Sequence, residues 1–339
     1  MTLNVALIGT GMVAGTHVAA IDASEKVTLK GVLARTPEST KRVANKHGVQ
    51  AYHDVEAIAA DTEVSFVIIA TPPNARLELI ETLARAGKPI LLEKPVARDL
   101  PEAKVIVDRC AKADIPLGIV FQHRMRDASQ KATDLVASGE LGALGVASLD
   151  VPWWREQAYY DEPGRGTYAR DGGGVLISQA IHTIDLALSL TGPVANVQAM
   201  TATSRFHAME AEDFAAAGLT FSNGAVGSLT ASTASYPGGA ETITLHFERA
   251  SLHLGSGILT VSWRDGRVES LGASATTGGG ADPMAFTHEW HQGIIEDFAG
   301  AIDSGRNPVV TGEQALASHL LIDAIERSAK SGKRVELEQ

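Results

Sequence analysis

The sequence is poor in cysteine, in basic residues and in long apolar runs, and each shortage excludes something. Its one cysteine, Cys110, cannot form a disulfide within the chain, which is typical of a reducing compartment. Lysine and arginine total 29 against 40 aspartates and glutamates, so the formal net charge is -11. Nucleic acids and anionic membranes bind basic faces, and we expect neither as a partner.

No apolar run approaches the roughly 20 residues that a membrane-spanning helix needs. The opening MTLNVALIGTG leads directly into a strand and lacks the basic-then-apolar pattern of an export signal. The predicted location is therefore the cytoplasm. What the chain does have is length, because 339 residues exceed what one hydrophobic core usually organises. We expect two domains, over residues 1–122 and 123–339.

Strand and helix patterns alternate through residues 1–122. The predicted strands are Leu3–Ile8, Val27–Leu33, Val64–Ala70, Ile90–Leu92 and Leu117–Phe121, and helices are expected from Pro37, over Ala75–Ala86 and over Leu100–Ala113. This alternation predicts an α/β domain with a Rossmann-type, doubly wound parallel sheet and right-handed crossovers. Ligands of such sheets bind outside the carboxyl ends of the strands.

The loop after the first strand, Gly9-Thr10-Gly11-Met12-Val13-Ala14, fits G-x-G-x-x-A between a strand and a helix. Gly9 would permit the tight turn, and Gly11 the close approach of a pyrophosphate. Backbone N–H groups of the segment Gly9, Thr10, Gly11, Met12 and Val13 would then hold the phosphates at the helix start. We therefore predict dinucleotide binding here. The alternative is an ordinary strand–helix turn without a ligand.

The choice of cofactor should show where the second predicted strand ends. An acidic residue at that point would bind the ribose 2′-hydroxyl of NAD. The sequence there is Val32-Leu33-Ala34-Arg35-Thr36, with no acid. Arg35 is placed to meet a 2′-phosphate and Thr36 to donate a hydrogen bond, which favours NADP(H) over NAD(H). The alternative is that Arg35 is simply a solvated loop residue.

In residues 123–339 strand-like runs follow one another and no longer alternate with helices. The runs are Leu144–Val151, Val194–Ala202, Phe214–Phe221, Ala225–Ser232, Thr242–Phe247, Ile258–Trp263 and Val268–Leu271, and two helices are expected near Thr287–Ser304 and Gly312–Ser331. This predicts an α+β domain on a large, mainly antiparallel open sheet, whose closing helices are able to pack back on the first domain. An open sheet has one face for helices and another for a subunit interface, so we expect a homodimer or homotetramer.

One segment of this half, VLISQAIHTIDLALSL, predicts a helix that follows Asp171-Gly172-Gly173-Gly174. Its apolar residues Ile177, Ile181, Ile184 and Leu188 are spaced for one buried stripe. Ser178, His182 and Asp185 form a separate polar stripe, which either faces a functional site or merely faces water. The three glycines before the helix would let another group approach the backbone closely.

The stretch PILLEKP ends a buried strand with two opposite charges and a proline. Glu93 and Lys94 follow Ile90–Leu92, so they lie at the carboxyl edge of the predicted sheet, where ligands bind. Adjacent residues of a strand point to opposite faces, which disfavours a surface ion pair between the two charges. His123 and Arg124, just past the last predicted strand of this sheet, reach the same edge, as pocket lining or as plain solvated residues.

Together these motifs resemble the Gfo/Idh/MocA family of oxidoreductases. GTGMVAGTH (9–17) is similar to the family's G-x-G-x-x-A-x-x-H opening, and LLEKP (91–95) to its E-K-P signature. ATPPNARLEL (70–79) is similar to its T-P-x-x-x-H segment, with Arg76 at the usual histidine position. DGGGVLISQAIHTID (171–185) is similar to its glycine-led helix, with Ser178 where aspartate is common.

The resemblance implies reversible hydride transfer between nicotinamide C4 and a secondary alcohol or ketone carbon of a sugar, cyclitol or related polyol. It implies His182 and Lys94 as the catalytic pair, and which of them moves the proton stays open. Cofactor contacts are implied for Thr71, Pro72, Pro73, Glu93 and Lys94, and substrate contacts for His123, Arg124, Arg165, Tyr168, Ser178 and Asp185. No metal is predicted, because His288, Glu289 and His291 lack H-E-x-x-H spacing.

Two other functions fit the same motifs. A glycosidase on this scaffold would oxidise and re-reduce its substrate with tightly held NAD, and would release an aglycone without net cofactor turnover. A regulator that senses nucleotide or sugar would keep the fold without the chemistry. The presence of both Lys94 and His182 favours the dehydrogenase, whereas Ser178 in place of aspartate keeps the regulator open.

Overall fold

The computed structural model describes residues 2–275 and 286–337 and divides the chain into two compact units. The first unit comprises residues up to 122 together with 287–316, and the second comprises 123–286 together with 317–339. Whether these units fold as independent domains stays a prediction. Among the described residues, no helix has the length and apolar character that crossing a membrane demands.

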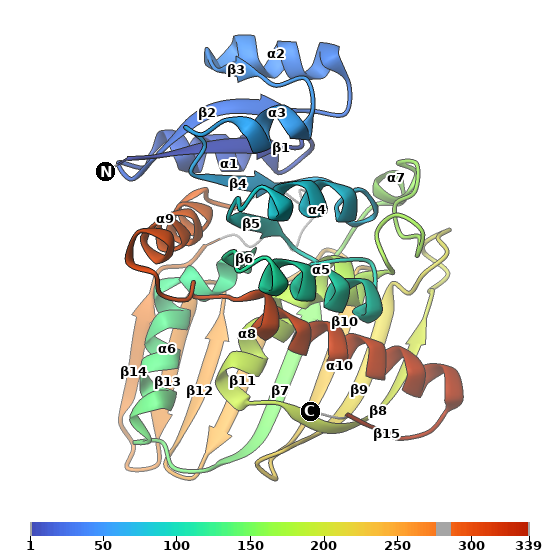
Figure 1. Ribbon diagram of the computed structural model, residues 1–339. Coiled ribbons are helices and arrows are strands. Elements are labelled where there is room, and N and C mark those ends of the chain that lie inside the picture. Colours follow the sequence, from blue (N-terminus) through green and yellow to red (C-terminus); the bar gives the residue numbers. More distant parts are fainter. Residues whose placement is uncertain (1, 276–285, 338–339) are drawn as a thin grey trace. The chain divides into compact units, whose positions relative to one another are not determined.

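The first unit is built on a six-stranded sheet in which every neighbouring pair of strands is parallel (Figure 1). The strand order is β3-β2-β1-β4-β5-β6. The strands are β1 (Leu3–Ile8), β2 (Val27–Leu33), β3 (Gln50–Ala51), β4 (Phe66–Ile69), β5 (Ile90–Glu93) and β6 (Leu117–Val120). The predicted doubly wound sheet is thus confirmed. β3 was not expected, because its two residues are exposed and leave no apolar run.

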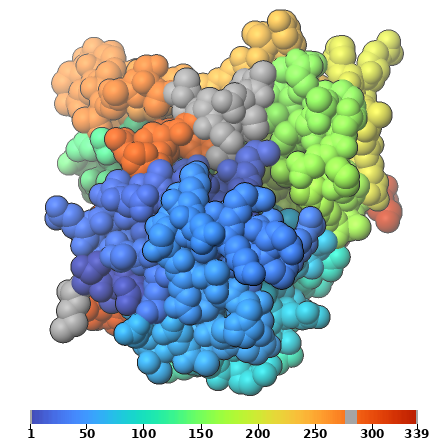
Figure 2. Space-filling model, turned by 90° about the horizontal axis from the view of Figure 1, so that it is seen from above, coloured from blue at the N-terminus to red at the C-terminus, as the bar shows by residue number. Residues whose placement is uncertain are grey.

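Helices cover both faces of this sheet. They are α1 (Ala14–Asp22), α2 (Pro37–His47), α3 (Val55–Ala60), α4 (Leu77–Arg85), α5 (Leu100–Lys112) and α9 (Glu289–Ser304), with a short 3-10 turn, η1, at Pro73–Ala75. α3, α4 and α5 pack in a row on one face, and α9 lies against α1, β2 and β6 on the other. Figure 2 looks down on the blue N-terminal part of this unit, where α2 and β3 form the surface.

α9 belongs to this unit although nearly 170 residues separate it from β6, and one aromatic side chain shows why. The Phe298 ring packs edge-on against Phe66, with ring centres 5.3 Å apart. A side chain at Gly118 would come within 2.6 Å of that same ring, so glycine there lets the helix approach the sheet. Ile119 of β6 also donates its N–H to the carbonyl of Val310, in the segment between α9 and α10.

The second unit is built on a nine-stranded sheet in the order β14-β13-β12-β11-β7-β10-β9-β8-β15. Its strands are β7 (Leu144–Pro152), β8 (Val194–Ala202), β9 (Phe214–Phe221), β10 (Val226–Ser232), β11 (Thr242–Phe247), β12 (Ala250–Gly255), β13 (Ile258–Trp263), β14 (Val268–Gly272) and β15 (Val335–Glu336). All pairs are antiparallel except β7 and β10, which confirms the predicted, mainly antiparallel sheet. β12 and β15 were not expected.

Helices lie on one face of this sheet (Figure 1). α6 (Asp127–Ser138) packs on β12, β13 and β14, while α8 (Ile181–Thr191) packs on β7 and β11 and touches α6. α10 (Gly312–Ser331) runs from the first unit into the second, where Ser328 Oγ accepts from the N–H of Ala199 on β8. α7 (Gln157–Tyr160) is a single turn in the loop after β7. No helix among the described residues covers the sheet's other face.

The predicted helix that carries His182 differs from expectation in its first five residues. Leu176–Ala180 is π-helical, and the α-helix begins only at Ile181. A π-turn spaces its hydrogen bonds five residues apart instead of four, so it rotates the residues before it relative to those after it. Ser178 lies inside this π-turn, whereas His182 and Asp185 lie on the α-helix that follows it.

Candidate active site

The glycine loop has the geometry that a dinucleotide site needs. Gly9 has φ +104°, and a side chain on it would come within 2.6 Å of the carbonyl oxygen of Ala70 at the end of β4, so only glycine fits. At Gly11, by contrast, a side chain would meet nothing within 4 Å. No side chain of the described residues caps the start of α1 at Val13. Space and helix N–H groups are thus both available beside Gly11.

The end of β2 offers a cation and a hydroxyl. Arg35 is exposed, two residues past the last residue of β2. Thr36 caps α2, because its Oγ1 accepts a hydrogen bond from the N–H of Ser39 at 3.2 Å. An accepting hydroxyl still has its own proton to donate, so the capping role leaves the predicted phosphate contact available to Thr36.

Glu93, the last residue of β5, is buried, which makes a surface ion pair with Lys94 wrong. One carboxylate oxygen lies 2.8 Å from Nε2 of His17 on α1 and 3.7 Å from Nε2 of His291 on α9. The other oxygen accepts the backbone N–H of Lys94 at 3.1 Å. The Glu93 carboxylate therefore orients the main chain of Lys94 and lies beside the imidazoles of His17 and His291.

The charge state of this cluster follows from its surroundings. Burial by itself would raise the pKa of Glu93, but the hydrogen bond with His17 and the nearby imidazole of His291 outweigh burial and hold that pKa well below the ordinary value. Burial lowers the pKa of His291 and outweighs the attraction of Glu93. Glu93 is therefore ionised at neutral pH, and His291 is neutral.

His17, Glu93 and His291 also offer three atoms of the kinds that bind transition metals, all within 4.8 Å of one another. The prediction of no metal considered only the sequence neighbours of His291, whereas its partners here come from α1 and β5. The hydrogen bond between His17 and Glu93 satisfies the carboxylate without an ion. The absence of a resident metal stays a prediction.

The loop after β4 reaches the same edge of the sheet. Thr71 and Pro72 follow β4 directly, and Pro73 begins η1. β4 pairs with β1 on one side and β5 on the other. The ends of three adjacent strands therefore bring together the glycine loop, Thr71–Pro73 and Glu93–Lys94, as the sequence predicts for the cofactor.

In the second unit, His182 is buried on α8 and stacks on His123. The two imidazole rings are 4.7 Å apart at an angle of 24°. His123 belongs to the short turn Gln122–Met125 and is 3% exposed, so the solvated alternative is wrong for it. Its Nδ1 lies 3.9 Å from a carboxylate oxygen of Glu241.

Glu241 is the anion of this region, and sequence reasoning missed it. It pairs with Arg126 at 2.7 Å and accepts from Nε1 of Trp153 at 3.3 Å. Glu241 and Arg126, together with His123 and Thr183, line a cavity of about 20 Å³, which is room for one water molecule. The Trp153 side chain is itself buried.

Asp185, an expected substrate contact, pairs with Arg124. Its two oxygens accept from Nε and Nη2 of Arg124, each at 2.7 Å. Burial raises the pKa of Asp185 and the guanidinium lowers it, with burial prevailing. Two predicted substrate residues are thus a bidentate pair that fixes the turn after β6 to α8.

The three glycines before α8 do admit another group, and that group is Glu212. Its carboxylate accepts the N–H groups of Gly174 at 3.1 Å and Leu176 at 3.0 Å, so it caps the π-turn. A side chain on Gly174 would come within 1.8 Å of the Glu212 carbonyl oxygen. Nothing in the sequence around Glu212 signals this cap, since its target lies 38 residues earlier.

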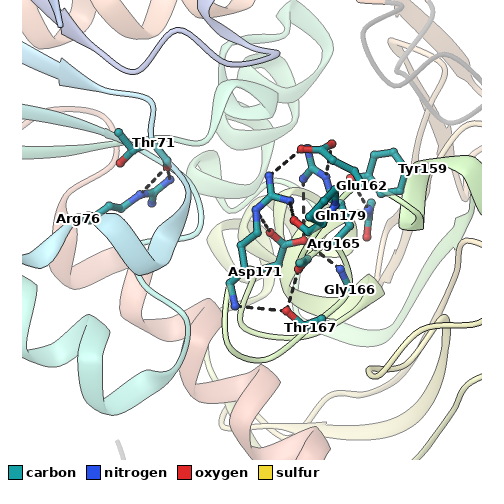
Figure 3. A network of polar contacts seen from close by, with 12 residues as sticks. Thr71, Arg76, Tyr159, Glu162, Arg165, Gly166, Thr167, Asp171 and Gln179 are labelled. Atoms are coloured by element: carbon teal, nitrogen blue, oxygen red, sulfur yellow. Dashed lines mark hydrogen bonds and ion pairs between the residues drawn. The ribbon is translucent and has the colours of Figure 1, made fainter. Parts of the chain in front are cut away.

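Arg165 belongs to a network within its own loop (Figure 3). Its guanidinium lies over the Tyr159 ring at 4.9 Å and reaches Glu162 at 3.2 Å and Asp171 at 3.9 Å. Tyr168 is half exposed, and burial with nearby carboxylates raises its pKa to about 12. Substrate contacts for Arg165 and Tyr168 stay predictions, and so do those for Ser178, which is half-buried in the π-turn.

The predicted residues thus form two sets. Gly9–Val13, Arg35, Thr71–Pro73 and Glu93–Lys94 lie in the first unit, and His123, Arg124, Ser178, His182 and Asp185 lie in the second. Because Lys94 and His182 belong to different units, their joint action on one hydroxyl stays a prediction.

Comparison with known proteins covers both units. The family profile described as "Oxidoreductase family, NAD-binding Rossmann fold" matches residues 3–121, and the one described as "GFO/IDH/MocA C-terminal domain" matches residues 129–253. The D-apiose dehydrogenase of Rhizobium rhizogenes is 27% identical, over 98% of this chain and 96% of its own. The inositol 2-dehydrogenase of Rhizobium meliloti is 25% identical, over 99% of this chain and 100% of its own.

The chain is also similar to a dehydrogenase of known structure. The WlbA dehydrogenase from Bordetella pertussis, in complex with NADH and UDP-GlcNAcA, is 26% identical, with a TM-score of 0.86 over 100% of this chain and 98% of its own.

Proposed function

Because the chain belongs to the Gfo/Idh/MocA family of oxidoreductases, we propose that it moves a hydride between nicotinamide C4 and a secondary alcohol or ketone carbon. The substrate class is a sugar, cyclitol or related polyol. The observation that carries the proposal is that the open glycine loop after β1 and Glu93–Lys94 at the end of β5 lie at the same edge of the sheet, on either side of β4. Relatives named for dehydrogenation of D-apiose and inositol support the substrate class.

In this proposal the cofactor carries the hydride, and the protein orients the substrate and takes the hydroxyl proton. Lys94 extends from a turn whose main chain Glu93 holds, which suits a donor that polarises the substrate oxygen. His182 is the acid/base, because an imidazole titrates near neutral pH without help. Its ring is held in place by the stack on His123.

The preferred cofactor in this proposal is NADP(H). The support is the cation Arg35 and the lack of an acidic residue at the end of β2. The WlbA dehydrogenase with bound NADH argues the other way, so the choice depends on the residues of this chain and needs a direct test.

The first experiment is a fluorescence titration of the purified protein with NADPH and, separately, with NADH. We expect NADPH to bind more tightly, and the Arg35→Ala variant to lose that preference while it keeps its affinity for NADH. Tighter binding of NADH by the natural protein would contradict the role of Arg35. A screen of sugars, inositols and other polyols with the preferred oxidised cofactor then identifies the substrate.

The same screen distinguishes a dehydrogenase from the alternative, a glycosidase. A glycosidase would release the aglycone of an aryl glycoside while the amount of reduced cofactor stayed constant. A dehydrogenase would instead accumulate reduced cofactor in proportion to the alcohol consumed.

A further inference from the structure

Arg76 is a buried cation whose hydrogen bonds all go to backbone carbonyls. It lies between η1 and α4 and is 2% exposed. Its Nε and Nη2 donate to the carbonyl of Thr71 at 3.0 and 2.7 Å, as Figure 3 shows. Its Nη1 donates to the carbonyls of Glu93 and Pro95. A guanidinium presents its N–H donors in a rigid planar fork, so it fixes the relative positions of the groups that it binds.

The carbonyls bound by Arg76 lie at two neighbouring strand ends. Thr71 follows β4, while Glu93 ends β5, and β4 and β5 are paired in register from Val67 with Ile90 to Ile69 with Leu92. Past those pairs the ladder stops: the N–H of Lys94 goes to the Glu93 carboxylate, and Pro95 has no N–H to donate. Beyond this point the hydrogen bonds of the Arg76 guanidinium, in place of strand pairing, connect the Thr71 loop to the Lys94 turn.

The residue between the two bound carbonyls of the turn is Lys94. Its own N–H is held by the Glu93 carboxylate at 3.1 Å, and the carbonyls on either side of it are held by Arg76. The main chain of Lys94 is therefore fixed from both sides, and only the side-chain torsions remain. Catalytic groups need placement to within about 0.5 Å.

We propose that Arg76 is a positioning residue for hydride transfer: it holds the Lys94 turn and the Thr71 loop in one arrangement, so that substrate and cofactor groups meet correctly. This rests on the proposed function of Lys94. Burial lowers the pKa of Arg76 to about 10, with Glu93 and Glu102 opposing, so the guanidinium stays charged at neutral pH.

A matched control exists at the opposite edge of the same sheet. Lys88 precedes β5, and its Nζ donates to the carbonyls of Asp61 at 2.6 Å and Val64 at 2.9 Å, both ahead of β4. It is also a cation that ties two backbone carbonyls together beside β4 and β5, but away from the ligand edge. Lys88→Met therefore reports what loss of such a cation does to stability alone.

The test compares Arg76→Met, Arg76→Lys and Lys88→Met in the full chain. Amide hydrogen exchange is followed in peptides that cover residues 70–76 and 89–98, at equal distance below each variant's melting temperature. We expect faster exchange in both segments for Arg76→Met and no such change for Lys88→Met. This measurement needs no substrate.

Steady-state kinetics with the polyol found by the screen completes the test. For Arg76→Met we expect kcat to fall on the order of 100-fold, as a displacement of about 1 Å does. Arg76→Lys keeps a donor cation and should recover part of kcat. Lys88→Met should keep kcat.

Three results would overturn the inference: unchanged exchange at 89–98 in Arg76→Met, equal kcat losses in Arg76→Met and Lys88→Met, or no recovery by Arg76→Lys. If the natural protein oxidises no polyol, the proposed function fails on its own. The exchange data then decide alone whether Arg76 holds the turn.

Discussion

At the scale of single residues, the site is made of charges whose partners are remote in sequence. Glu93 and Lys94 are adjacent, yet Glu93 is buried against His17 and His291 while Lys94 is half-buried at the strand end. A buried carboxylate must be hydrogen-bonded to remain ionised. His17 and the Lys94 N–H meet that requirement, so the opposite charges of E-K-P serve separate purposes.

The catalytic assignment predicts how two substitutions act. Lys94→Ala and His182→Ala should each lower kcat by on the order of 10²–10⁴, because each removes a group that handles the hydroxyl proton. The dissociation constant of the cofactor, measured by fluorescence titration, should change far less. His53→Ala, at an exposed histidine of the first unit, serves as the control. Near-full turnover in both variants would show that the catalytic residues lie elsewhere.

The buried His291 predicts a dependence of stability on pH. Because burial lowers its pKa from the ordinary 6.5, the unfolded chain takes up a proton below pH 6.5 that the folded chain refuses. The free energy of unfolding should therefore fall as the pH drops below 6.5, by at most about 1.4 kcal/mol per pH unit for this one group. Glu93, whose pKa is depressed below 4.5, adds to the loss only below pH 4.5.

Urea unfolding at a series of pH values checks this effect. His291→Gln keeps an N–H donor but cannot be protonated, so its stability should change less between pH 6.5 and 5 than that of the natural chain. His53→Gln, at an exposed position, should leave the pH dependence as it is. If the free energy of unfolding depended on pH in the same way in His291→Gln and the natural chain, other groups would be the cause of the loss of stability in acid.

At the scale of elements, the start of the His182 helix is the part whose geometry is most constrained. The π-turn at Leu176–Ala180 and the cap from Glu212 both depend on the close approach of two backbones at Gly174. Ser178 lies within the π-turn, whereas His182 and Asp185 lie on the α-helix after it. Such turns commonly occur at functional sites, and this one directly precedes the helix that carries His182.

Gly174→Ala should therefore destabilise the second unit strongly. Its methyl group would lie 1.8 Å from the Glu212 carbonyl oxygen, and neither backbone can move away without losing the cap. We expect the free energy of unfolding to fall by about 3 kcal/mol or more. Gly300→Ala, in the interior of α9, should instead be neutral or stabilising by up to about 1 kcal/mol. Denaturant unfolding measures the stability of both variants. Equal changes in the free energy of unfolding would contradict the close approach of the Gly174 and Glu212 backbones.

At the scale of the whole molecule, the uncovered face of the nine-stranded sheet carries small and apolar side chains. Ser148, Ser228, Gly218 and Thr244 lie in register across β7, β10, β9 and β11, and the apolar Val146, Val226 and Met200 on the same face are exposed. A flat face with few charges suits contact with a second copy, which supports the proposed homo-oligomer.

Light scattering after size exclusion tests this proposal. We expect a mass of two or four chains of 35.6 kDa each for the natural protein. Ser228→Arg, in the middle of the uncovered face, should lower the mass toward that of one chain, because a charge buried there would have no partner. Lys41→Glu, on α2 of the first unit, should not. A monomeric natural protein would show that this face is solvated.

The sequence by itself determined the class of each sheet and the position of the glycine loop, since both depend on local apolar patterns and on turn residues that act over a few positions. It also placed Lys94 at a strand end and His182 on a helix. Strands with little apolar pattern, such as β3, could not be predicted from the sequence.

Only the tertiary structure decided which partners each polar residue has. Glu93 with His17 and His291, Glu241 with Arg126, and Glu212 with Gly174 are separated by at least 38 residues, and no spacing rule joins them. The same holds for Arg76, which sequence reasoning recorded only as a departure from a motif. Buried polar groups must be satisfied wherever the fold brings a partner, so their roles become visible only when the chain is folded.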